Sequence, residues 1–146
     1  MKTVRKSVLI WYSPAEMFRL VSDVESYPAF LPWCGSGKVL EKTPDGMVAE
    51  VGISLAGFKQ TFVTRNHEIP DRQIDLDLVR GPFSDLHGQW RFEPVGDGQQ
   101  RACRIHFELQ YGFSSRTLAA LVGPVFDKIA GSFVDAFLQQ AKKVYG

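Results

Sequence analysis

The sequence predicts an α+β fold in which a curved, seven-stranded antiparallel sheet wraps around one long C-terminal helix. From residue 36 to 112, apolar and polar residues mostly alternate, as in antiparallel strands with one dry and one wet face. After Ser115, apolar residues recur at spacings of three and four, which predicts an amphipathic helix of about 28 residues. A sheet with one apolar face and a helix with one apolar stripe bury both by packing together.

A first strand over residues 2–11 is followed by a well-capped helix. Ser13 suits the N-cap, Pro14 suits the first helical position, and Glu16 completes a capping box. We therefore expect a helix from 14 to about 24. A second, short helical turn is expected within the stretch from Tyr27 to Cys34, where prolines prevent a longer helix.

Turn signals divide the alternating region into six strands, which join the first one. The signals are Pro44-Asp45-Gly46, Ala56-Gly57, Pro70-Asp71, Gly81-Pro82 and Gly96-Asp97-Gly98. A sheet of seven strands twists and curls, so its dry face becomes concave. Gly123-Pro124 lies inside the final helix and should kink or interrupt it.

The length of 146 residues suits one domain over residues 1–146. The net charge of +1 gives no global field that would attract nucleic acid, so we expect no DNA partner. The N-terminus lacks the apolar segment of a signal peptide, and no uninterrupted apolar run approaches the length of about 18 residues that a transmembrane helix needs. We expect a cytoplasmic protein, or one peripheral to the inner membrane, with Cys34 and Cys103 as free thiols.

Three runs of the sequence resemble one known family. They are Tyr27 to Cys34 (YPAFLPWC), Phe58 to Asn66 (FKQTFVTRN) and Gly81 to Phe92 (GPFSDLHGQWRF). With the strand around Cys103 to Phe107 and the final helix, the chain resembles the coenzyme-Q-binding START-domain family over essentially its whole length. This family lies in the polyketide cyclase/START-like superfamily and includes the bacterial ribosome association toxins. The resemblance implies a helix-grip fold with a cavity between sheet and helix.

The resemblance leaves two roles open. Some members bind a long isoprenoid quinone such as ubiquinone and support respiration, which implies a non-enzymatic chain with a bound isoprenoid, no catalytic cofactor, and an open tunnel with an apolar mouth. Others are described as binding the large ribosomal subunit and blocking subunit joining, which predicts a contiguous basic surface. A third reading, a cyclase or hydrolase, needs polar groups inside the pocket. The dry registers offer only Tyr111, Cys103 and either Gln60 or Thr64.

The candidate ligand site is a set of mostly aromatic side chains that we expect to face the interior. They are Tyr27, Phe30, Leu31, Trp33, Phe62, Phe83, Trp90, Phe92, Ile105, Phe107, Phe126, Ile129 and Phe133. The first four form either an apolar mouth or a plug that fills one end of the sheet, and the residues alone slightly favour the plug. Phe58 and Phe83 lie near turn tips. Both are expected to fold inward, with Phe83 the better candidate for an exposed ring.

Nothing in the sequence suggests a metal site. His67, His87 and His106 lie on separate predicted strands, and there is no His-x-x-x-His or Cys-x-x-Cys pair. Asp75 and Asp77 share the wet face of one strand, which indicates a solvated surface rather than an acid–base pair. The basic residues are interspersed with acids, which favours a mixed-sign surface over an RNA-binding patch.

Overall fold

A computed structural model of the chain describes residues 1–55 and 57–146. The elements follow the predicted order of strand, helix, helical turn, six strands and long helix. They are β1 (Lys2–Ile10), α1 (Pro14–Ser22), the 3-10 helix η1 (Val24–Ala29), β2 (Cys34–Thr43), β3 (Gly46–Leu55), β4 (Phe58–Ile69), β5 (Gln73–Arg80), β6 (Phe83–Pro94), β7 (Cys103–Phe113) and α2 (Arg116–Tyr145). The predicted seven-stranded antiparallel sheet and its C-terminal helix are confirmed.

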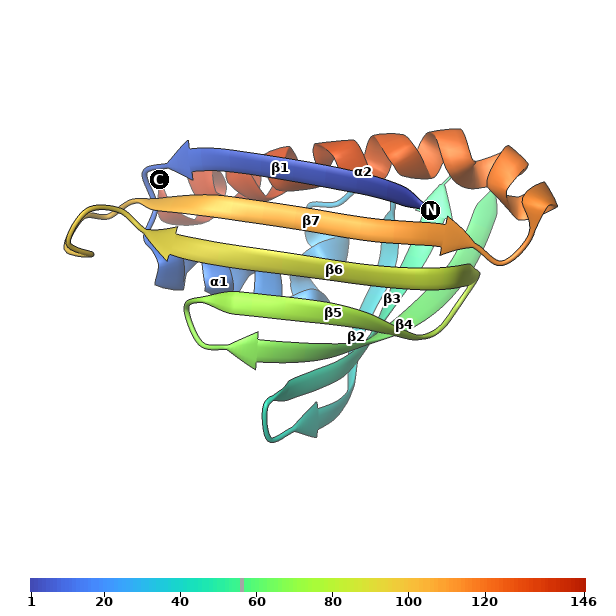
Figure 1. Cartoon of the computed structure of the whole chain (residues 1–146), viewed down its shortest axis with the longest axis horizontal. Coiled ribbons are helices and arrows are strands. Elements are labelled where there is room, and N and C mark those ends of the chain that lie inside the picture. The colour runs from blue at the N-terminus through green and yellow to red at the C-terminus, as the bar shows by residue number, and fades with distance from the viewer. Residues whose placement is uncertain (56) are drawn as a thin grey trace.

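The strands form one sheet in the order β1-β7-β6-β5-β4-β3-β2, with every neighbouring pair antiparallel. Figure 1 shows β3 and β4 running at a steep angle to β6 and β7, so the sheet is strongly curved, while α2 lies along the β1 and β7 side. The strands alternate as predicted, for example in the buried positions Cys103, Ile105 and Phe107 of β7. This curvature creates the space that the site occupies.

The capping box predicted for α1 is present. The Glu16 backbone N–H donates to Ser13 Oγ at 3.1 Å, and the Ser13 N–H donates to Glu16 Oε1 at 2.9 Å. The helix ends at Ser22, two residues earlier than predicted, because Asp23 adopts a non-helical backbone with φ −84° and ψ 72°. The helical turn therefore begins at Val24 rather than inside the proline-rich stretch.

Helix α2 is continuous over 30 residues, so Pro124 does not interrupt it. Figure 1 shows its first turns bending away from the line of the rest, as expected where a proline lacks the N–H that would reach back one turn. The apolar stripe packs on the sheet through Phe126, Ile129, Val134 and Phe137.

By length and composition alone, α2 is also apolar enough to cross a membrane, with a mean hydropathy of 1.4 over 18 residues. The sequence prediction counted uninterrupted apolar runs, whereas a window average tolerates the scattered polar residues of α2, so the compositional match does not overturn that prediction. In the fold, the stripe of α2 is instead used to cover the concave face of the sheet. A core helix of this kind passes the same compositional test as a membrane span.

Four of the five turn signals coincide with breaks between strands, and for the fifth Ala56 lies outside the described residues. Gly81 has φ +152°, and a Cβ on it would lie 2.5 Å from Phe62 Cβ. The β5–β6 turn therefore needs glycine for two reasons, its backbone conformation and its close approach to β4.

Candidate functional site

Two apolar cavities lie between the sheet and α2. The end cavity, near the start of α2, has a volume of about 70 Å³. It is lined by Ile53, Leu55, Phe58, Pro82, Phe83, Phe113, Leu121, Val122, Val125, Phe126 and Ile129. The central cavity has a volume of about 60 Å³. It is lined by Val24, Tyr27, Trp33, Ala49, Val51, Phe62, Thr64, Asn66, Leu76, Leu86, Trp90, Leu109, Phe126, Ile129, Ala130 and Phe133.

Among residues 1–55 and 57–146, the two apolar cavities are too small to be the open tunnel that isoprenoid binding predicts. A water molecule occupies about 30 Å³ of liquid, whereas pockets for drug-sized ligands span about 300–1,000 Å³. Each cavity of 60–70 Å³ is therefore small, and Phe126 and Ile129 stand between the two because they line both. Around these cavities, buried side chains pack into one hydrophobic core.

Many of the core contacts are between aromatic rings, and Trp90 takes part in several of them. Its ring centroid lies 4.5 Å from that of Phe107, 5.3 Å from Phe137 and 6.5 Å from Phe133. Trp33 stacks on Phe133 at 5.4 Å. Such contacts stabilise the fold beyond the area they bury.

The structure brings eight of the thirteen predicted site residues to a cavity wall. They are Tyr27, Trp33, Phe62, Trp90, Ile129, Phe126 and Phe133 at the central cavity, with Phe83 added at the end cavity. Phe30, Leu31, Phe92, Ile105 and Phe107 line neither cavity and pack in the core. That the lining residues bind a ligand stays a prediction.

The stretch after η1 is divided between mouth and plug. Leu31, 1% exposed, is core, and the half-buried Phe30 packs edge-on against Phe137 at 5.3 Å. Tyr27 and Trp33 reach the central cavity. The plug interpretation therefore fits Phe30 and Leu31. Tyr27 and Trp33 instead form part of the wall of the central cavity.

Phe83 folds inward and is 4% exposed, so the idea that its ring is the better candidate for exposure was wrong. Its centroid lies 5.5 Å from that of Phe62 and 5.2 Å from that of Phe126. Phe58 is half-buried at the end cavity. Both turns thus contribute a ring to the wall, because inward packing removes that ring from water.

One polar pair faces the central cavity. Thr64 and Asn66 are each 5% exposed, and Thr64 Oγ1 donates to Asn66 Oδ1 at 2.6 Å. The two residues share a face because side chains on a strand alternate with a period of two. The sequence reasoning considered Thr64 and overlooked Asn66, although the same alternation places it on the dry face.

The other polar candidates do not line either of the two apolar cavities. Gln60 is exposed, and Cys103 lines neither apolar cavity. Tyr111 donates its hydroxyl proton to Asp127, which also pairs with Lys2 at 2.6 Å. Burial and the Asp127 bond raise the pKa of Tyr111. Burial acts to raise the pKa of Asp127, but the bonds from Lys2 and Tyr111 outweigh it and lower that pKa. This cluster ties β1 and β7 to α2, and its three side chains line a separate pocket of about 360 Å³ beside the first turns of α2.

The charged surface is of mixed sign, as predicted. Arg5 bonds Glu108 at 3.1 Å, and Arg65 lies opposite Asp77 in the sheet. His67 and His87 each lie 2.7 Å from an aspartate oxygen. Within residues 1–55 and 57–146, no group of three or more His, Cys, Asp or Glu side chains could hold a metal ion.

The curved sheet, the long covering helix and the apolar interior define a START-like binding fold. The family model described as "Polyketide cyclase / dehydrase and lipid transport" matches residues 10–138. The chain belongs to this family.

Curated relatives extend over nearly the full length of the chain. The chain is 42% identical over 145 residues to "Ribosome association toxin RatA" of Escherichia coli (strain K12), covering 99% of this chain and 90% of the relative. It is 39% identical over 143 residues to the protein of that name in Pseudomonas aeruginosa, covering 98% and 97%. It is 30% identical over 142 residues to "Coenzyme Q-binding protein COQ10 homolog B, mitochondrial" of Xenopus laevis, covering 97% and 58%. The predicted family is therefore confirmed.

Solved structures confirm the fold. An 18 kDa protein from Caulobacter crescentus superposes with a TM-score of 0.76 at 31% identity, covering 100% of this chain and 99% of the other. The Zhui aromatase/cyclase from a Streptomyces species superposes with a TM-score of 0.82 at 15% identity, covering 97% and 94%. The second likeness shows the shared fold alone, because one fold hosts unrelated activities.

Proposed function

We propose that this chain binds an apolar small molecule, an isoprenoid such as ubiquinone, between the concave face of the sheet and α2, without catalysing a reaction. The observation that carries the proposal is the cavity lining, in which apolar side chains predominate and Thr64 and Asn66 are the buried polar residues. An isoprenoid tail offers no hydrogen bonds, so area and fit must hold it.

Binding a long tail requires side chains of α2 to move. Phe126 and Ile129 separate the two cavities, and their displacement would join the cavities into one channel. Leu121, which is 73% exposed, borders the end cavity and marks the side from which an apolar ligand, or a membrane that supplies it, would approach.

The test is solvent extraction of the natively purified protein, followed by mass spectrometry for quinones and lipids. A stoichiometric quinone supports the proposal. The matched control is Ala130→Leu, which fills the central cavity from α2 without changing the surface, since Ala130 is 1% exposed and lines it. An empty native protein that also fails to take up added quinone contradicts the proposal.

A second candidate function, association with the ribosome, is favoured by the bacterial relatives. We propose it because relatives 39% and 42% identical over nearly their whole length are named as ribosome association toxins. The predicted contiguous basic surface is not seen on the described part of the sheet. However, Arg91 and Arg104 are exposed on neighbouring strands and have no ion-pair partner within 4.0 Å among the described residues. They are the side chains we expect to contact RNA phosphates.

Co-sedimentation with purified large subunits tests this second proposal. Binding should weaken steeply with added salt, and the double variant Arg91→Glu/Arg104→Glu should reduce it further. The matched control is Lys142→Glu/Lys143→Glu, which changes the same charge at the far end of α2. Salt-independent binding, or equal loss in both double variants, contradicts the assigned surface. Ala130→Leu should leave ribosome binding intact, which separates the two functions.

A further inference from the structure

The polar pair of the central cavity has unused hydrogen-bonding capacity. Asn66 Oδ1 accepts a hydrogen bond from the Thr64 hydroxyl group, whereas Asn66 Nδ2 has no hydrogen-bond partner among the described residues. Asn66 is 5% exposed and lines the cavity. Among the described residues, the fully buried side-chain atoms without a partner are Glu68 Oε2 and His106 Nε2, so Asn66 Nδ2 keeps some accessible surface. A donor on a largely buried side chain is stabilised by an acceptor that reaches it.

One acceptor side chain shares this face of β4, because Glu68 lies two residues along the strand and its Oε2 is buried without a hydrogen-bond partner. No hydrogen bond among the described residues joins it to Asn66. The residues opposite Asn66 are Met47 on β3 and Leu76 on β5, and Thr64 lies opposite Ala49 and Leu78. Tyr27, the other hydroxyl at this cavity, donates to the Val21 carbonyl at 2.5 Å. The Tyr27 hydroxyl proton is therefore already in a hydrogen bond within the chain.

We propose that Asn66 Nδ2 donates a hydrogen bond to a carbonyl oxygen on the head group of the bound ligand, and that Thr64 holds the amide in the orientation this requires. The inference rests on the proposed ligand-binding function and adds the direction in which the ligand lies in the site. The head group lies at the Thr64–Asn66 pair, and the tail extends past Phe126 and Ile129 toward the end cavity. A site built around a hydrogen bond discriminates strongly against analogues that lack the matching group.

Two probe compounds separate head-group recognition from apolar burial. They are a benzoquinone with a ten-carbon tail and an alkylbenzene with the same tail. Trp33 and Trp90 line the cavity, so quenching of tryptophan fluorescence reports quinone binding, and competition reports the alkylbenzene.

The decisive variant is Asn66→Leu, which keeps the size of the side chain and removes the donor. We expect about tenfold weaker quinone binding and unchanged or tighter alkylbenzene binding. Thr64→Val should weaken quinone binding about threefold, because the amide loses its orienting partner. The control Leu109→Val trims the wall without touching the polar pair and should change both affinities by a similar factor.

The double variant Thr64→Val/Asn66→Leu tests whether weaker quinone binding comes from a loss of folding stability. It removes both hydrogen-bonding partners, so its urea midpoint without ligand should equal or exceed that of the wild type. Unchanged quinone affinity in Asn66→Leu, equal loss of both compounds, or a lowered midpoint in the double variant would each overturn the inference alone. A wild-type protein that binds neither compound would overturn the ligand-binding function and this inference together.

Discussion

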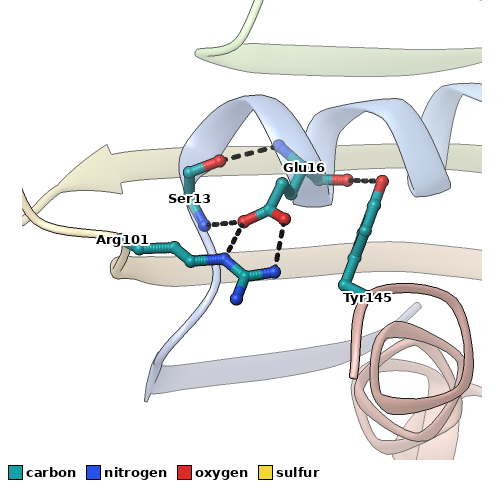
Figure 2. Close-up of polar contacts among 4 residues, drawn as sticks. All are labelled: Ser13, Glu16, Arg101 and Tyr145. Carbon is teal, nitrogen blue, oxygen red and sulfur yellow. Dashed lines mark hydrogen bonds and ion pairs between the residues drawn. The ribbon is translucent and has the colours of Figure 1, made fainter.

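Arg101, in the loop between β6 and β7, holds the carboxylate of Glu16 on α1 through two hydrogen bonds. Nε lies 2.9 Å from Oε1 and Nη2 lies 2.7 Å from Oε2 (Figure 2). The same glutamate caps α1 at Ser13, and its backbone carbonyl accepts the Tyr145 hydroxyl at 2.9 Å. One residue thus joins the first helix, a strand loop and the end of α2.

This ion pair predicts an acid-sensitive contribution to stability. The hydrogen bond from Arg101 lowers the pKa of Glu16 from 4.5 to about 2. The contribution is therefore complete above about pH 4.5 and is lost as the pH falls toward about 2. Urea unfolding should show Glu16→Gln less stable than the wild type at pH 6, with the gap narrowing across that window. A gap that stays constant down to pH 2 would show that the carboxylate charge is not responsible.

Both cysteines should be inert in the native protein. Cys34 and Cys103 are free and buried, and burial raises the pKa of Cys103 to about 12 and raises that of Cys34. Since the thiolate is the reactive form, we expect no reaction with Ellman's reagent at pH 8 until urea unfolds the chain, when two thiols react. Rapid labelling of either thiol in native buffer would contradict the described packing.

Phe137 should be among the most sensitive core positions. It is 0% exposed and contacts the rings of Tyr27, Phe30 and Trp90. Phe137→Ala is expected to lower the free energy of unfolding by about 3–5 kcal/mol, measured by urea denaturation. The control Val144→Ala, on the same helix but 52% exposed, should change it by less than about 0.5 kcal/mol. Similar losses in both variants would argue against this placement of α2.

Removing the Phe126 ring should join the two cavities, because Phe126 lines both. Phe126→Ala is expected to cost about 3–5 kcal/mol of stability and to leave an apolar void. A small aromatic such as toluene should then raise the melting temperature of the variant more than that of the wild type, since a ligand that binds only the folded state stabilises it. Equal shifts in the two proteins would mean that the cavities stay separate or collapse.

Local spacing explains why much of the fold could be predicted from the sequence. Alternation over residues 36–112 specified strands and their dry face, and the stripe after Ser115 specified α2. Ser13 and Glu16 specified the start of α1 because a capping box involves residues only three apart. The end of α1 was predicted too late, since the non-helical backbone of Asp23 leaves no periodic signal.

The sequence by itself therefore determined which residues face the interior, and eight of the thirteen predicted site residues do line a cavity. Only the tertiary structure decided how much of that interior is empty. Periodicity orients a side chain but says nothing of the distance to the opposite wall, where Phe126 and Ile129 of α2 meet rings from several strands. The sequence could not predict the free amide of Asn66 or the pairing of Arg101 with Glu16, because a hydrogen bond depends on where its partner lies in space.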